Sequence, residues 1–107
     1  MLYVTTQVGV PIYIAEKIQI MTLRANQEKQ TAMLGVEYED GTRELLNMKA
    51  GQVLNSELMI SRLGKHSIKL DEVLSGRKLN IGLQFPASVS INRWQIHWNL
   101  TNRKRSA

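Results

Sequence analysis

Two stretches decide the fold: MLYVTTQVGVPIYIAEKIQIMTL at residues 1–23 and LNIGLQFPASVSINRWQIHW at residues 79–98. In the first, residues suited to a buried strand face share one parity, namely Ile12, Ile14, Ile18, Ile20 and Thr22. In the second, the shared parity is carried by Leu79, Ile81, Leu83 and Phe85, and it resumes after Pro86 with Val89 and Ile91. A period of two indicates half-buried β-strands. Both ends of the chain are therefore predicted to consist mainly of strands.

The middle of the chain predicts one more hairpin. Residues 31–38 are predicted as a strand, residues 39–41 as a turn closed by Gly41, and residues 42–48 as the partner strand. Near the end, apolar residues recur at a spacing of four, which predicts a short C-terminal helix; they are Trp94, Ile96, Trp98 and Leu100. The predicted class is all-β with a short C-terminal helix.

Composition narrows the functional classes. The 107 residues suffice for one compact unit or two very small ones, and no apolar run approaches the roughly 20 residues of a membrane span. No secretory signal and no cysteine is present, so we expect a cytoplasmic protein that makes no membrane contact. His66 and His97 lack partners at metal-ligand spacing, and no catalytic motif is present. We therefore expect no enzyme, no metal and no cofactor, whereas the net charge of +5 favours a polyanionic partner.

Four segments, residues 1–14, 18–23, 79–86 and 89–96, resemble the carbon storage regulators, the CsrA/RsmA family. Gly9, Gly82, Pro86 and Arg93 stand where that family has its turn glycine, its strand glycine, its turn proline and its strand arginine. The resemblance implies a small translational regulator that binds GGA-containing loops in messenger RNA or in small regulatory RNA. It further implies interleaved antiparallel sheets, with each RNA site built from a first strand and a last strand.

The RNA-binding residues that the resemblance implies are Val4, Thr5 and Thr6 on the first strand and Ile91, Asn92 and Arg93 on the last. Arg62 is a further candidate, and the tail residues Arg103, Lys104 and Arg105 are expected to add auxiliary phosphate contacts. An arginine side chain suits this role because its planar fork bonds a guanine edge or a phosphate in a bidentate manner. The family's basic pair is missing, however, since Thr6 and Gln7 occupy those positions.

The chain is longer than the roughly 60 residues of family members, and two interpretations of the extra residues stay open. One is a tandem chain with repeats of about 1–54 and 55–107, in which residues 57–70 form a second opening strand and glycine turn. The same opening motif can also be laid on residues 44–54 around Gly51. The other interpretation is one domain with an inserted hairpin region. A tandem chain would form the family's dimer within itself, as a pseudo-dimer.

Two functions follow from these observations. The first is a post-transcriptional regulator, such as a translational repressor, that binds RNA. The second is a divergent protein-interaction module that has lost RNA binding and acts through a protein partner, which Thr6 and Gln7 favour. A protein antagonist or a homo-oligomer is a further expected partner.

Overall fold

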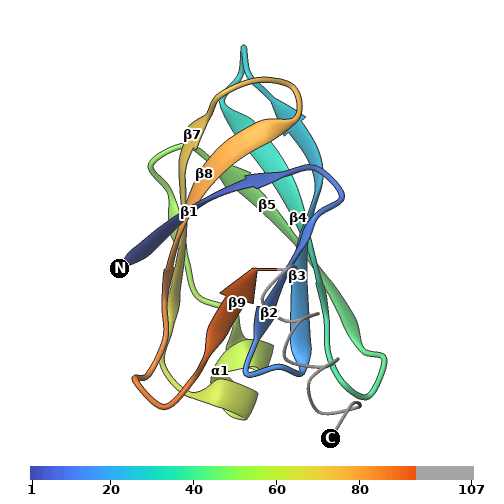
Figure 1. The fold of residues 1–107 in the computed structure, drawn as a ribbon, viewed down its shortest axis with the longest axis vertical. Helices are drawn as coiled ribbons and strands as arrows, with labels where there is room; N and C mark the ends of the chain where they lie inside the picture. Colours follow the sequence, from blue (N-terminus) through green and yellow to red (C-terminus); the bar gives the residue numbers. More distant parts are fainter. Residues whose placement is uncertain (94–107) are drawn as a thin grey trace, which may run out of the picture.

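The computed structural model describes residues 1–93, which form two antiparallel β-sheets packed face to face and one short helix (Figure 1). The four-stranded sheet has the order β1 (Leu2–Gln7), β8 (Lys78–Gln84), β7 (Ser67–Val73) and β6 (Val53–Leu54). The five-stranded sheet has the order β5 (Arg43–Lys49), β4 (Thr31–Glu37), β3 (Ile18–Asn26), β2 (Pro11–Ile14) and β9 (Ile91–Arg93). Helix α1 (Glu57–Leu63) lies at the lower end of the molecule in Figure 1.

Most strands lie where the alternation of the sequence predicts them. The predicted central hairpin is confirmed, since β4 and β5 pair from Thr31 opposite Lys49 to Glu37 opposite Arg43. The predicted strands at both ends are also confirmed as β2, β3, β8 and β9. The mostly β class therefore holds for residues 1–93, while the predicted C-terminal helix lies outside the described residues.

The prediction of an opening strand within residues 57–70 is wrong for its first half, which is helix α1. Ser56 caps this helix, because its Oγ accepts a hydrogen bond from the backbone N–H of Met59 at 3.2 Å. Gly64 ends it with a φ of 90°, and its N–H donates to the carbonyl of Ile60. The two caps satisfy backbone groups that a strand here would have to pair with a neighbour, so local capping decides against the strand that the resemblance to the opening motif implies.

Strands β1 to β4 (residues 2–37, here the first half) and strands β5 to β9 (residues 43–93, here the second half) repeat one arrangement. In the first half, β1 leads through Gly9 (φ 85°) into β2, and the Gly9 N–H donates to the Thr22 carbonyl of β3 at 2.9 Å. In the second, β5 leads through Gly51 (φ 87°) into β6, and the Gly51 N–H donates to the Leu70 carbonyl of β7 at 2.7 Å. Strands β5 and β6 thus correspond to β1 and β2 in their turn glycine and in the bond that this glycine makes to the next strand.

The halves also exchange their outer strands. Strands β2, β3 and β4 are flanked by β5 and β9 from the second half, and β6, β7 and β8 are flanked by β1 from the first. Strands β3 and β7 each have a β-bulge directly after the residue that bonds the turn glycine. The bulge lies between Thr22 and Arg24 in β3 and between Leu70 and Glu72 in β7. Within residues 1–93, the only missing counterpart is a strand that would border β6 as β9 borders β2.

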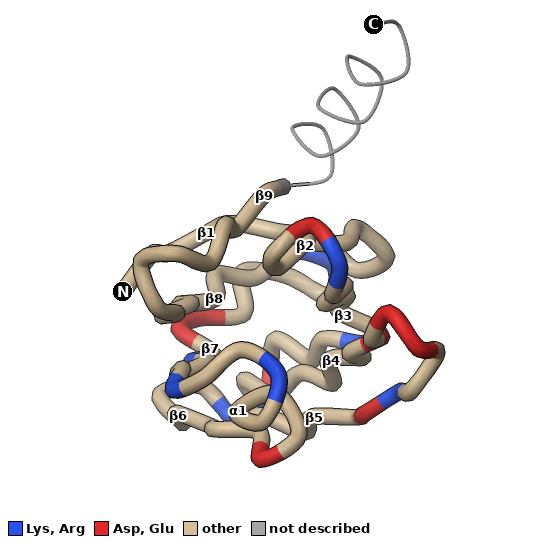
Figure 2. The backbone as a smooth tube through the Cα atoms, turned by 90° about the horizontal axis from the view of Figure 1, so that it is seen from below, with Lys and Arg blue, Asp and Glu red and all other residues tan. Residues whose placement is uncertain are grey.

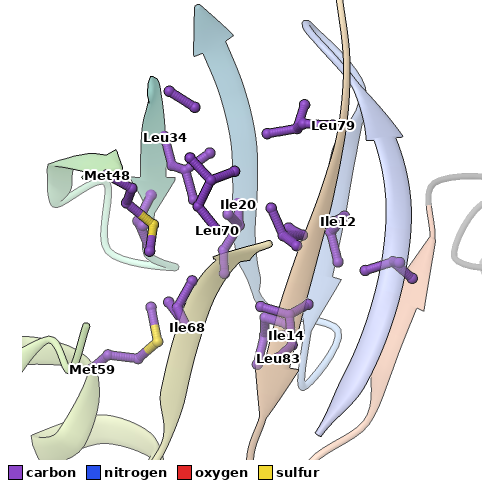
Figure 3. Close-up of a cluster of buried hydrophobic side chains, with 14 of the residues drawn as sticks. Ile12, Ile14, Ile20, Leu34, Met48, Met59, Ile68, Leu70, Leu79 and Leu83 are labelled. Carbon is purple, nitrogen blue, oxygen red and sulfur yellow. The ribbon is translucent and has the colours of Figure 1, made fainter. Parts of the chain in front are cut away.

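The core lies between the two sheets (Figure 3). The inward parity of the strands supplies most of it, and Met59 adds a fully buried side chain from α1. The most enclosed members include Ile14, Ile20, Leu34, Ile68, Leu70, Leu79, Ile81 and Leu83. Burial of branched aliphatic side chains from both halves joins them into one core. In the described part of the chain, no helix has the length and apolarity required to cross a membrane.

Candidate nucleic-acid interface

The candidate interface is formed by two strands, β1 and β9, that each border a sheet. Within residues 1–93, β1 pairs only with β8 and β9 pairs only with β2. Each strand therefore has one edge of backbone N–H and C=O groups without a strand partner, which is an edge able to bond another chain. Figure 2 shows β1 and β9 on the same side of the sandwich.

Strand register brings the end of β9 to the end of β1. Arg93 is paired with Ile12 on β2, and β2 follows β1 through a tight turn in which the Val10 N–H donates to the Gln7 carbonyl at 3.1 Å. Arg93 is therefore one strand spacing away from a residue that lies directly after this turn. The structure thus places the end of β9 beside the start of β2, which follows the last residue of β1 by four positions.

The β1 residues of this pair differ in what they expose. Val4 and Thr6 are only 6% and 7% exposed and face the core, whereas Thr5 is exposed. The Thr5 hydroxyl donates to the Asn80 amide oxygen at 2.7 Å. Of the three predicted β1 residues, only Thr5 can therefore offer its side chain to a ligand.

Core packing and a backbone hydrogen bond hold the β9 residues in place. Ile91 packs against the core cluster, and the preceding Ser90 carbonyl accepts a hydrogen bond from the Ala15 N–H at 2.8 Å. Asn92 is paired with Tyr13 and is half-buried. The edge is thus fixed in position before any ligand binds, which lowers the entropic cost of recognition.

Arg62, the other predicted RNA contact, belongs to a different group of residues. Its guanidinium donates to Asp40 Oδ2 at 2.8 Å and lies 4.7 Å from the centre of the Tyr38 ring. The hydrogen bond from Arg62 lowers the pKa of Asp40 below its ordinary range. Arg62 therefore ties α1 to the β4–β5 turn, and the structure does not bring it together with β1 and β9. Figure 2 views this end of the molecule from below, with the acidic residues of the turn in red.

A polar network closes the space between α1 and β5. The Ser56 hydroxyl donates to Glu44 Oε1 at 2.7 Å, and the Tyr38 hydroxyl donates to the same oxygen at 2.8 Å. Burial, partly offset by a hydrogen bond with Ser56 and assisted by the hydrogen bond to Glu44, raises the pKa of Tyr38 to about 12. His66 Nε2 accepts a hydrogen bond from the Ser56 N–H at 3.1 Å. These residues therefore hold the α1 segment against β5.

No group of three histidine or carboxylate residues within residues 1–93 is placed to hold a metal ion. His66, the only histidine there, stacks on Phe85 at 5.4 Å between ring centres. Its two ring nitrogens lie against the backbone of Ser56 and Gly64. The histidine that the sequence offers for chemistry is thus a packed core residue in the structure.

Sequence reasoning missed one cationic group, formed by Arg24, Lys29 and Lys49 around a hollow at the end of the five-stranded sheet. The three residues are up to 25 positions apart, and only the pairing of β3, β4 and β5 brings them together. No spacing in the sequence could have revealed it. The predicted contacts at Arg103, Lys104 and Arg105, like Trp94 and Trp98, lie outside the described residues.

No family model matches this chain, and neither a curated protein nor a solved structure matches it.

Proposed function

We propose that this protein is an RNA-binding post-transcriptional regulator of the carbon-storage-regulator type, which holds a GGA-containing RNA loop at the edge formed by β1 and β9. One observation carries the proposal. The two halves of the chain exchange their outer strands, so that the first strand of one half and the last strand of the other border neighbouring sheets on one side of the molecule. This exchange supports the proposal, because the resemblance of the two end segments implies interleaved sheets. One chain would then act as a pseudo-dimer.

The chemistry of this edge suits an RNA loop. Bases in a loop are unstacked, so their hydrogen-bonding edges are open to protein backbone and side chains. Strands β1 and β9 offer backbone donors and acceptors, Thr5 offers a hydroxyl and Asn92 an amide. Arg93 supplies a guanidinium group for a guanine edge or a phosphate. The overall charge of +5 adds attraction to the RNA backbone.

A mobility-shift titration tests the proposal. Binding of a hairpin RNA with a GGA loop is compared with binding of the same hairpin with a scrambled loop, at one fixed salt concentration. We expect the GGA loop to bind more tightly, and Arg93→Ala to lose about 1–3 kcal/mol of binding free energy, roughly tenfold or more in affinity.

The matched control is Arg43→Ala, which removes the same charge from β5 at the opposite edge of the five-stranded sheet. It should change affinity by less than about threefold, because it removes only a diffuse electrostatic contribution. Equal losses in the two variants, or equal affinity for the two loops, would contradict recognition at the β1/β9 edge.

The second candidate is a protein-interaction module, and the outer face of the five-stranded sheet favours it. Leu45 and Leu23 are 61% and 41% exposed there, and Leu23 lies against Gly35 between them. Exposed apolar side chains on one sheet face are typical of protein contacts. A translational reporter with a GGA-containing leader separates the candidates. An RNA regulator loses repression with Arg93→Glu, whereas a protein module loses its effect with Leu45→Glu and keeps it with Arg93→Glu.

A further inference from the structure

A hollow of about 530 Å³ lies at the end of the five-stranded sheet, lined by β3, β4, β5 and the turns that follow β3 and β5. Three of its lining residues are cations, namely Arg24, Lys29 and Lys49. Three others carry side-chain amides, namely Asn26, Asn47 and Gln52. No carboxylate is among the described residues that line it. The hollow is thus a place where positive charge and neutral hydrogen-bond donors converge.

No ion pair within residues 1–93 includes a cation of this hollow. The ion pairs found within these residues are Lys17–Glu39, Arg43–Glu37 and Arg62–Asp40. Arg24 bonds only the sulfur of Met33, at 3.7 Å. Like charges gathered without a counter-charge repel one another, so a bound anion would stabilise the site.

The backbone around the hollow is held by several hydrogen bonds. Gln30 joins the β3–β4 turn to β7, because its amide group donates to the Val73 carbonyl and accepts from the Val73 N–H, both at 2.9 Å. The Gln30 carbonyl accepts from the Ala50 N–H at 2.8 Å, which ties the same turn to the β5–β6 turn. The Gln52 amide oxygen accepts from the Lys49 N–H at 3.0 Å. The backbone at Lys29 and Lys49 is therefore held in place, so the site is preorganised.

Of the three cations of the hollow, Arg24 is nearest in register to the β1/β9 edge, whereas Lys49 lies four strand spacings from β9. The turn after β1 is bonded to Thr22 through Gly9, and Arg24 follows Thr22 directly after the β3 bulge. Arg93 is opposite Ile12 on β2, which is opposite Ile20 on β3, so Arg93 is two strand spacings, about 10 Å, from β3. Arg24 lies roughly 10 Å further along β3 from Ile20. A nucleic acid strand a few nucleotides long covers this separation.

We propose that this hollow binds phosphodiester groups of the RNA strand that flanks the loop held at β1 and β9. The inference rests on the proposed function and adds a second contact to it. Arginine, lysine, asparagine and glutamine side chains are common donors to phosphate oxygens, and the hollow presents all four types. Since such contacts carry no sequence information, the hollow would add affinity and orientation, and leave the choice of loop to the β1/β9 edge.

The test compares RNAs that differ only outside the loop. One is the blunt GGA-loop hairpin, and two others carry a single-stranded oligouridine extension on either side. The double variant Lys29→Ala/Lys49→Ala is compared with Arg43→Ala/Lys65→Ala, which removes two exposed charges elsewhere. All four substituted side chains are exposed, so both variants should fold as the parent does, which a thermal melt verifies.

We expect an extension to raise the affinity of the parent protein roughly tenfold, and the Lys29/Lys49 variant alone to lose that gain. For this variant, the slope of log affinity against log salt concentration should be shallower than that of the parent by about 1.4, which is the value for two lost contacts to a single strand. An extension with a neutral methylphosphonate backbone should bring no gain, because the contact needs the phosphate charge.

Three results would overturn the inference while the proposed function stands. The first is a hairpin complex that depends on Arg93 but that no extension strengthens. The second is an equal loss of affinity in the two double variants. The third is that inorganic phosphate, at matched ionic strength, abolishes the affinity gained from the extension. Competition by polyglutamate as strong as by oligouridine would also overturn it, because the hollow would then bind any polyanion. If the blunt hairpin itself fails to bind, the proposed function fails and the inference falls with it.

Discussion

The strand pairs β1–β2 and β5–β6 have the same glycine turn but are followed by different structures. β1 and β2 are joined through Gly9 in the same way as β5 and β6 through Gly51, with left-handed glycines and equivalent bonds to the next strand. β2 then continues for four residues and accepts β9 as a neighbour. β6 stops after two residues, and the chain enters α1. Within residues 1–93, the edges of β1 and β9 therefore have no further strand partner, whereas α1 and its polar network lie beside β5.

The largest expected effect concerns the side chain that anchors helix α1. Met59 is fully buried, so Met59→Ala should leave a cavity and lower the free energy of unfolding by about 2–5 kcal/mol, measured by urea denaturation. The neighbouring Ile60→Ala, at a side chain 38% exposed, should cost less than about 1 kcal/mol. A similar small loss at both positions would mean that α1 contributes little to the core.

Two matched glycines test the equivalence of the turns. Gly9→Ala and Gly51→Ala each place a Cβ on a left-handed residue with open space around it, so steric contact with neighbours does not contribute. Each should lower the free energy of unfolding by about 1–2 kcal/mol, and by similar amounts. Gly76→Ala, also in open space but without a left-handed φ, is the control and should cost nothing. Clearly unequal losses at Gly9 and Gly51 would break the comparison between the two turns.

The N-cap of α1 is expected to have a smaller effect. Ser56→Ala removes the acceptor for the Met59 N–H and a hydroxyl donor to Glu44, and should cost about 1 kcal/mol in chemical denaturation. Ser61→Ala serves as the control, because the Ser61 hydroxyl only bonds the carbonyl of Leu58 within the helix. If the two substitutions prove equivalent, capping by Ser56 does not explain why this segment is helical.

The smallest expected effect is a pH dependence at the contact between α1 and the β4–β5 turn. The bond from Arg62 holds the pKa of Asp40 below its ordinary value of 3.8, so the stabilisation it brings is present above that pH and lost as the pH falls below it. The difference in melting temperature between the parent and Asp40→Asn should therefore be constant from neutral pH to about pH 5 and shrink below about pH 4. A difference that stays constant down to acid pH would show that ionisation of Asp40 is irrelevant. Asp71→Asn controls for the loss of one exposed carboxylate.

The part of the fold that depends on local pattern was predictable from residue parity and turn chemistry. The strands at both ends and the hairpin closed by Gly41 lie where the alternation placed them. Residues 57–63 were expected to be a strand because residues 57–70 resemble the opening segment of the chain, whereas the helix that forms there depends on capping by Ser56 and Gly64. Parity cannot weigh a cap against a pairing whose partner strand is unknown.

The candidate site divides in the same way. Alternation along the two end segments identified their strand residues, and the resemblance of these segments to the carbon storage regulators implied Thr5 and Arg93 as partners in one site. Only the tertiary structure decided that β1 borders β8, that β9 borders β2, and that Arg62 is engaged by Asp40. The grouping of Arg24, Lys29 and Lys49 likewise depended on register. The physical reason is that alternation and turn propensities act over a few residues, whereas strand neighbours are chosen by burial of the whole core, to which all parts of the chain contribute at once.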